Sequence, residues 1–350
     1  MTDPQNVVTL TVGGLDYAGW KSIKIIAGFE QQARTFELGI TWQWPGRASS
    51  IRIVPGDRCE VRIGNDLVLT GWVWATPIAY DSAKTTLTVQ GSSLTVDLVE
   101  CSAINQPGQW CKQTLLQIAQ ALAAPYGVQV VSELGALKPI PTHSIVPGET
   151  VFKSLDRLLT LQLAYSSDDP QGRLVLTRPG SGGEACDGLA LGRNVLSASA
   201  QRNSTQCFSE YRLITQRQRS EADASKDACE VEALSHDRSV RKRVLVLVEG
   251  NQMHRDVAQQ RIDWERRSRE AQAWEATYVV QGWRQSNGEL WRPNTLVWVH
   301  DPIIGLDRQV LIAKVTYALD DKGTLSTLEV APAAKFELNP TDPQRLGNKA

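Results

Sequence analysis

The chain has 350 residues, with 37 basic and 38 acidic side chains and a formal net charge of -1. This length is enough for two or three domains, and the hydrophobic fraction of 42% predicts a sizeable core. The neutral balance argues against a basic surface for nucleic acid or for an anionic membrane. The apolar runs are only as long as strands, and the first ten residues lack the pattern of a signal peptide. We therefore expect no membrane span and no leader.

Strand-like alternation fills residues 1–100. Five to seven short segments with apolar side chains at alternate positions are separated by turn residues such as Gly64 and Asn65. This pattern predicts a first antiparallel β-barrel. Tryptophans two apart on one strand share a face, and we expect them in the core or at a subunit interface. The interface candidates in the whole chain are Trp42, Trp44, Trp72, Trp74, Trp291 and Trp298.

The hydrophobic period becomes helical in residues 101–180. Leu115, Ile118 and Leu122 mark one stripe of a helix that begins at a capping-box pair, Thr114 and Gln117. A second amphipathic helix is expected over "TVFKSLDRLLTLQL", and the hairpin "AYSSDDPQGRLVLTRP" follows it. Residues 101–180 are therefore predicted to form a small α/β module.

Strands resume after the glycine-rich linker "GSGGEACDG". Residues 181–216 and 276–338 are predicted to form a second β-barrel, interrupted by a charged insert at 217–275 with one strand and a helix from about Arg255 to Ala273. Residues 339–350 are expected to be a flexible tail. The predicted fold is thus mainly β with α+β elements: two similar antiparallel β-barrels separated by the α/β module and the insert.

One hairpin pattern occurs twice. The segment "VLTGWVWATPIAYDSAKTTLTVQG" at residues 68–91 returns as "VLIAKVTYALDDKGTLSTLEVAP" at residues 310–332. The aligned positions include Val68 with Val310, Gly71 with Ala313 and Val73 with Val315. Hairpins resemble one another by chance, but each copy also ends a β-rich block and follows a strand that a proline introduces. We therefore favour an internal duplication.

Residue patterns of catalysis are absent from the sequence. The segment "GSGGEA" has the glycines of a phosphate-binding loop, but Pro179 precedes it and no helix follows. Asp168 and Asp169 are neighbours on a Pro-Gly turn, where carboxylates point apart and are solvated. The six cysteines are far apart and the four histidines scattered, so neither group has metal-ligand spacing. We expect reduced thiols, no catalytic residue, no metal and no cofactor.

Two resemblances to known families arise from the α/β module. The segment "IVPGETVFKSLDRLL" resembles the opening of LysM peptidoglycan-binding repeats. The chain also resembles the baseplate hub proteins of Mu-like contractile-tailed phages. This resemblance rests on the same segment with "TLLQIAQALAAPYGV" before it and "DDPQGRLVLTRPG" after it, between two β blocks. That family is the late control protein family, which is related to the hub half of type VI secretion spikes. The second resemblance covers nearly the whole chain.

The hub resemblance implies a structural protein of the virion tail baseplate, synthesised in the bacterial host cytoplasm. The resemblance also implies a trimer, in which the two tube-type barrels of each chain contribute to a pseudo-six-fold ring. The implied partners are the hexameric tail tube protein, the trimeric central spike and other baseplate proteins, with DNA only as cargo in the channel and no direct membrane binding. The alternatives are a LysM-like cell-wall-binding module and a tail-associated hydrolase.

Overall fold

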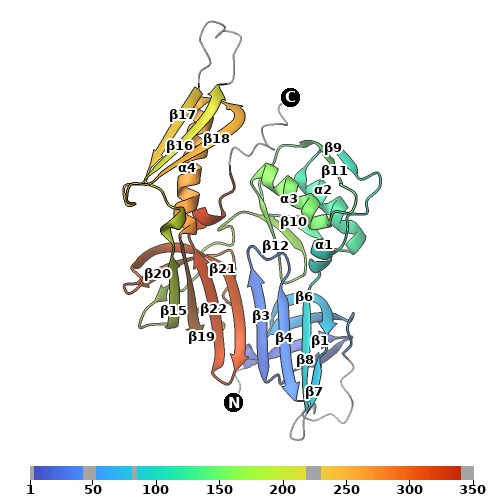
Figure 1. Cartoon of the computed structure of the whole chain (residues 1–350). Helices are drawn as coiled ribbons and strands as arrows, with labels where there is room; N and C mark the ends of the chain where they lie inside the picture. The colour runs from blue at the N-terminus through green and yellow to red at the C-terminus, as the bar shows by residue number, and fades with distance from the viewer. Residues whose placement is uncertain (1–3, 42–52, 81–84, 218–229, 340–350) are drawn as a thin grey trace. The chain divides into compact units, whose positions relative to one another are not determined.

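The computed structural model describes residues 4–41, 53–80, 85–217 and 230–339. The fold is mainly β, with 47% strand and 19% helix. It divides into two compact units, which are described separately below: Met1–Ser199 with Thr277–Val330, and Ala200–Ala276 with Ala331–Ala350 (Figure 1). None of the helices in the described segments is long and apolar enough to cross a membrane.

The first unit is built around a sheet of 14 strands, which fall into two sets. The N-terminal set contains, in sheet order, β3 (Ser22–Gly28), β4 (Thr35–Thr41), β8 (Thr85–Ser93), β6 (Asp66–Ala75), β5 (Arg58–Ile63), β1 (Val8–Val12) and β2 (Leu15–Tyr17), with β7 (Ile78–Tyr80) beside β8. The C-terminal set contains β15 (Val195–Arg202), β19 (Trp274–Gln281), β22 (Gly323–Ala331), β21 (Leu306–Asp320), β20 (Leu296–Asp301) and β14 (Leu189–Ala190).

The two sets follow the same strand order. The order β3-β4-β8-β6-β5 in the N-terminal set matches the order β15-β19-β22-β21-β20 in the C-terminal set. The hairpin pattern that occurs twice in the sequence therefore lies on equivalent strands, β6 with β8 and β21 with β22. Each set also alternates buried and partly exposed positions, as in β1 and β20, which is the pattern of strands with one face on a core.

The expected closure into two barrels is not seen among the described strands, which run as one sheet with free ends. The reason is the length of β21. Its first part, Leu306–Leu311, pairs with β20, whereas Lys314–Leu319 pairs antiparallel with residues 23–28 of β3. The edge that would close one barrel instead joins the two sets through backbone hydrogen bonds.

Helices and short strands between the two sets form the predicted α/β module. Its helices are α1 (Val96–Glu100), α2 (Leu115–Ala123) and α3 (Val151–Gln162). Its strands are β9 (Gln109–Gln113), β10 (Val130–Ser132), β11 (Ile140–Ser144), β12 (Tyr165–Asp168) and β13 (Leu174–Thr177). The capping box of Thr114 and Gln117 is formed as predicted, and Thr150 caps α3. The apolar stripes of both helices meet in one core with side chains of β10 and β13.

The second unit corrects one expectation from the sequence. The segment "EYRLITQR", assigned above to the second barrel, is β16 (Glu210–Arg217) and lies at the centre of a separate three-stranded sheet. Its neighbours are β17 (Glu230–His236) and β18 (Val244–Met253). Apolar side chains on one face of this sheet pack against the predicted helix, α4 (Arg255–Gln272), through Ala258 and Ile262. Residues 218–229 of the predicted insert, and the tail from residue 340, lie outside the described residues.

Candidate functional site

Four of the six tryptophans proposed as interface candidates lie within the described residues, and they differ in exposure. Trp42 and Trp44 lie outside the described residues. Trp291 is buried, and Trp72 is half-buried against the module core, where its indole N–H donates to Asp97 Oδ2 at 3.2 Å. Trp74 and Trp298 are 42% and 54% exposed and so offer large apolar surface to a partner.

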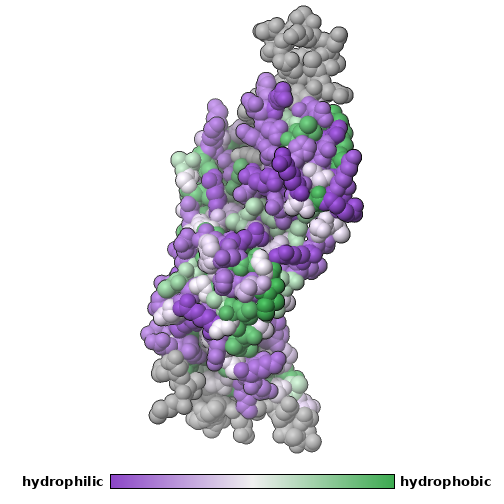
Figure 2. Space-filling model, turned by 90° about the vertical axis from the view of Figure 1, so that its left-hand side faces the viewer, coloured by the Kyte–Doolittle hydropathy of each residue, from purple (hydrophilic) through white to green (hydrophobic). Residues whose placement is uncertain are grey.

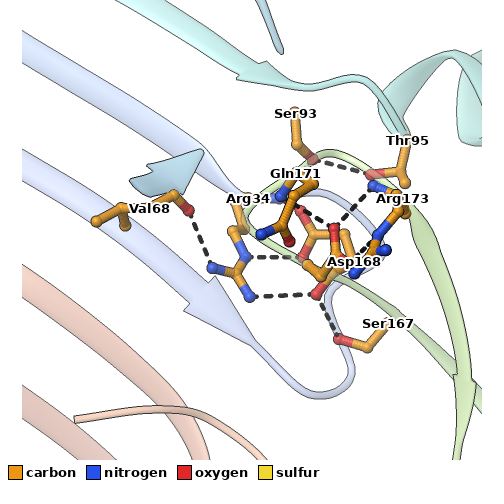
Figure 3. Close-up of polar contacts among 9 residues, drawn as sticks. Arg34, Val68, Ser93, Thr95, Ser167, Asp168, Gln171 and Arg173 are labelled. Carbon is orange, nitrogen blue, oxygen red and sulfur yellow. Dashed lines mark hydrogen bonds and ion pairs between the residues drawn. The ribbon is translucent and has the colours of Figure 1, made fainter. Parts of the chain in front are cut away.

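A buried ion pair links the N-terminal strand set to the α/β module (Figure 3). Arg34 precedes β4, and Asp168 ends β12. The Arg34 guanidinium Nε lies 3.1 Å from Asp168 Oδ1, and the Arg34 backbone N–H donates to Asp168 Oδ2 at 2.9 Å. A second guanidinium nitrogen donates to the carbonyl of Val68 on β6. One arginine therefore holds together β4, β6 and β12.

Burial and charge oppose each other at this pair. The Asp168 side chain is 1% exposed and that of Arg34 is 11% exposed. Burial raises the pKa of the Asp168 carboxyl above its ordinary value, while the Arg34 guanidinium, the Ser93 hydroxyl and the Arg34 N–H act against that rise. Asp169 turns to a different partner, with Oδ2 at 2.6 Å from Arg173 Nε. The two adjacent carboxylates thus have separate structural partners, which leaves neither free to act as an acid or base.

Further contacts surround the ion pair. Gln32 Nε2 donates to the carbonyl of Ser166 at 2.9 Å, and the Ser166 hydroxyl donates back to Gln32 Oε1 at 2.7 Å. The rings of Phe29 and Tyr165 lie 5.0 Å apart. The sequence did not reveal this contact between the N-terminal set and the module. Its partners are 134 residues apart, and each side looks locally like an ordinary turn.

A second polar cluster lies inside the module, on the segment that resembles LysM repeats. His143 Nε2 and the Ser154 hydroxyl are 2.9 Å apart, and the His143 ring stacks on Trp110. Burial acts to raise the pKa of Glu149, but hydrogen bonds from Arg157, the Val146 N–H and Ser154 outweigh it and lower that pKa to about 2. Ser154 is fully buried, so this serine, histidine and carboxylate hold α3 in place and are not arranged for attack on a substrate.

The pH dependence of stability is expected to reveal this cluster. Burial, and then the charge of Arg157, lower the pKa of His143 from 6.5 to about 4. The unfolded chain therefore takes up this proton more readily than the folded chain, and the contribution of neutral His143 is complete above pH 6.5 and is lost as the pH falls toward 4. We expect a loss of about 1–2 kcal/mol in this window, because residual access to water reduces the full effect of the shift.

Urea unfolding of the chain at a series of pH values measures this effect. His143→Gln, which carries no titrating group, should flatten the profile between pH 6.5 and 4. The effect of Glu149 falls in a separate window, from pH 4.5 toward 2, since its folded pKa is lowered. An unchanged profile in His143→Gln would show that the histidine does not titrate with folding.

A polar pocket of about 580 Å³ in the first unit lies beside the Arg34–Asp168 pair. Its lining includes charged side chains of both strand sets and of the module: Arg34, Arg62, Asp66, Asp168, Arg173 and Arg292. Asp66 binds Arg284 at 2.6 Å, so this carboxylate, like Asp168, is ion-paired. Within the described residues no group of three or more histidine, cysteine or acidic side chains could hold a metal ion. The five described cysteines are free thiols.

The overall fold of this chain is similar to that of solved tail proteins. A 43 kDa tail protein of prophage MuSo2 from Shewanella oneidensis superposes with a TM-score of 0.82 and 32% identity, covering 95% of this chain and 99% of the other. A tail protein from Neisseria meningitidis MC58 gives a TM-score of 0.75 at 22% identity, covering 95% and 98%. These similarities place the fold in the class of phage tail proteins.

The sequence comparison is more specific. The baseplate hub protein gp44 of Escherichia phage Mu is 30% identical over 354 residues, covering 98% of this chain and 92% of gp44. Family models match in three segments: the N-terminal domain of Mu phage baseplate assembly protein GpP-like proteins at residues 7–93, the second domain of gp44-like hub proteins at 95–178, and the fourth domain of GpP at 254–339. The chain therefore belongs to the family of Mu-type baseplate hub proteins, as the sequence resemblance predicted.

Proposed function

We propose that this chain is a structural hub of a contractile-tail baseplate, in which three copies form a ring of six similar units. The observation that carries the proposal is the repeated strand order within the first unit. A trimer that contacts a six-fold ring through equivalent surfaces must present six similar surfaces, and internal duplication supplies two per chain. In this proposal residues 1–100, and residues 181–216 with 276–338 apart from β16, are the two tube-like halves.

The proposed ring joins a hexameric tail tube on one side to a trimeric central spike on the other, and it leaves a channel through which DNA passes as cargo. Other baseplate proteins would contact the α/β module and the second unit. The near-neutral net charge of -1 suits a channel wall to which DNA does not adhere. The protein would be made in the host cytoplasm and function in the virion tail, without enzymatic turnover and without direct membrane binding.

No observation favours the LysM-like alternative. The turn of that segment directs Glu149 toward Arg157 inside the module, and the following helix buries Val151, Leu155 and Leu158. The polar and apolar groups of the segment are therefore used within the chain, and little of them remains for a glycan.

Light scattering on the purified chain tests the proposal. We expect a mass of three times 38.6 kDa, together with six-lobed rings in electron micrographs. The prediction follows from the six-fold argument, because one chain supplies only two of the six units. A mass that stays at one chain across a wide concentration range would contradict a self-assembling trimer, and rings of another symmetry would contradict the adaptor role.

A further inference from the structure

The joint between the two strand sets shows how neighbouring sets are held together. In this joint the C-terminal part of β21, Lys314–Leu319, pairs antiparallel with β3. The N–H of Phe29, just after β3, extends the ladder by donating to the carbonyl of Ala313 at 2.7 Å. One chain contains one such joint, whereas a ring of six sets needs six.

The shared strand order identifies the counterparts of both strands in this joint. β15 occupies in the C-terminal set the position that β3 has in the N-terminal set, and β6 followed by β7 occupies the position of β21. The outer edge of β15 pairs with no described strand. On the side of β6 that faces β5, the last backbone hydrogen bonds are those of Val73 with Gly56 and Asp57. Beyond Val73, no described strand pairs with this edge over residues 74–80. Figure 1 shows β15 and β6 on opposite sides of the sheet.

β15 pairs with β19 on one side, and the composition and exposure of residues 195–201 are those of a strand whose other edge is open. All side chains from Leu196 to Gln201 are exposed, whereas Ile23, Ile25 and Ala27 of the paired strand β3 are at most 5% exposed. Between Val195 and Gln201 there is no charged residue and no proline, which are the usual means by which natural sheets protect a free edge. An unprotected neutral edge of this kind favours strand addition.

Apolar surface lies near both free edges. Figure 2 views the side on which β15 and β20 lie and shows an apolar area within a largely hydrophilic face. Leu196 on β15 and the nearby Leu191 are 56% and 41% exposed. At the other edge Trp74, Ile78 and Tyr80 are 42%, 52% and 83% exposed. Two different apolar edges, one on the end strand β15 and one over residues 74–80, fit a head-to-tail contact between copies, which closes into a ring when the rotation permits.

We propose that β15 of one copy pairs antiparallel with residues 74–80 of a second copy, so that the contact between chains repeats the β3–β21 joint within the chain. This inference rests on the proposed ring and specifies the surfaces by which its chains meet. Three joints inside chains and three between chains then alternate around the ring, and they use the same pair of sheet positions.

Cross-linking between differently labelled chains tests the joint. In full-length protein with Cys111, Cys186 and Cys229 replaced by serine, one chain carries Leu196→Cys, Ser197→Cys or Ala198→Cys, and the other carries Trp74→Cys, Ala75→Cys or Thr76→Cys. Directly paired antiparallel residues have Cα atoms about 4.5–5.5 Å apart, which is within the reach of a disulfide. We expect mixed cross-links at a subset of these combinations, and none with Leu15→Cys on β2 as the exposed control.

Proline variants provide an independent measurement. Neighbouring residues of an antiparallel edge strand direct their N–H groups alternately to the inner neighbour and to the free edge. One of Ser197→Pro and Ala198→Pro should therefore keep the circular dichroism spectrum of the folded chain while its mass falls from three chains to one.

The outcomes separate this joint from the hub proposal. A chain that forms trimers but gives no cross-link in any combination, and whose folded proline variants remain trimeric, would overturn the joint and leave the hub standing. A wild-type chain that stays monomeric would overturn both.

Discussion

Replacement of Asp168 with alanine is expected to lower the free energy of unfolding by about 3–5 kcal/mol. The substitution leaves the Arg34 guanidinium, whose side chain is only 11% exposed, without its ionic partner. It also removes one of the two acceptors of the Arg34 backbone N–H, and the Ser93 hydroxyl is the other. A buried charge without a counter-ion costs far more than the pair contributes, because desolvation is no longer offset. Urea unfolding of the full chain gives this free energy directly.

Asp169→Ala is the matched control, since it removes a carboxylate at the adjacent position. Asp169 pairs with an Arg173 side chain that is 39% exposed, and pairs of this kind contribute about 0–1 kcal/mol. A double-mutant cycle of Asp168→Ala with Arg34→Met then measures the coupling of the buried pair. If Asp168→Ala and Asp169→Ala lowered the free energy of unfolding equally, the contact between β4 and β12 would not depend on the ion pair.

Local features of the fold were predictable from the sequence. The capping box of Thr114 and Gln117 fixed the start of α2, since the pattern and its hydrogen bonds lie within four residues. The repeated hairpin located β6 with β8 and β21 with β22 for the same reason: strand alternation and turn residues are short-range signals. The same kind of signal predicted helices where α2, α3 and α4 lie.

Features that depend on distant partners were not predictable. β16 has the same alternation as a strand of the large sheet, yet it pairs with β17 and β18. The continuation of β21 onto β3 depends on backbone groups, which every sequence carries, so side-chain patterns do not reveal it. Arg34 had no local signal at all, because its partner Asp168 appeared to belong to a solvated turn.

The connections between equivalent strands differ in length between the two sets. In the N-terminal set β3 and β4 are joined by a short turn that docks on the module through Gln32 and Arg34. In the C-terminal set the equivalent strands β15 and β19 are separated by β16, β17, β18 and α4. A surface connection tolerates such an insertion at little entropic cost, because closure entropy grows slowly with length. The two halves therefore keep one strand order while presenting different surroundings.

Gly71→Ala is expected to cost about 3 kcal/mol or more, although it adds a single methyl group. A Cβ atom at Gly71 would lie 1.9 Å from the carbonyl oxygen of Ser92 and 2.7 Å from the Cα of Ser93. These are backbone atoms of β8, so β6 and β8 would have to separate next to the bulge between Val73 and Ala75. Thermal unfolding of the full chain, with the midpoint compared to wild type, measures the loss.

The repeat supplies the matched control for this substitution. Ala313 is the residue that aligns with Gly71, and β21 carries this methyl group in the native chain. The reverse change, Ala313→Gly, should cost only about 0.5–1 kcal/mol, the usual penalty for glycine in a strand. If Gly71→Ala were as mild, the close approach of β6 and β8 would not be a requirement of the N-terminal set. If the asymmetry holds, the two sets share an order of strands but not a packing, and the six units of the proposed ring are equivalent at their edges rather than in their interiors.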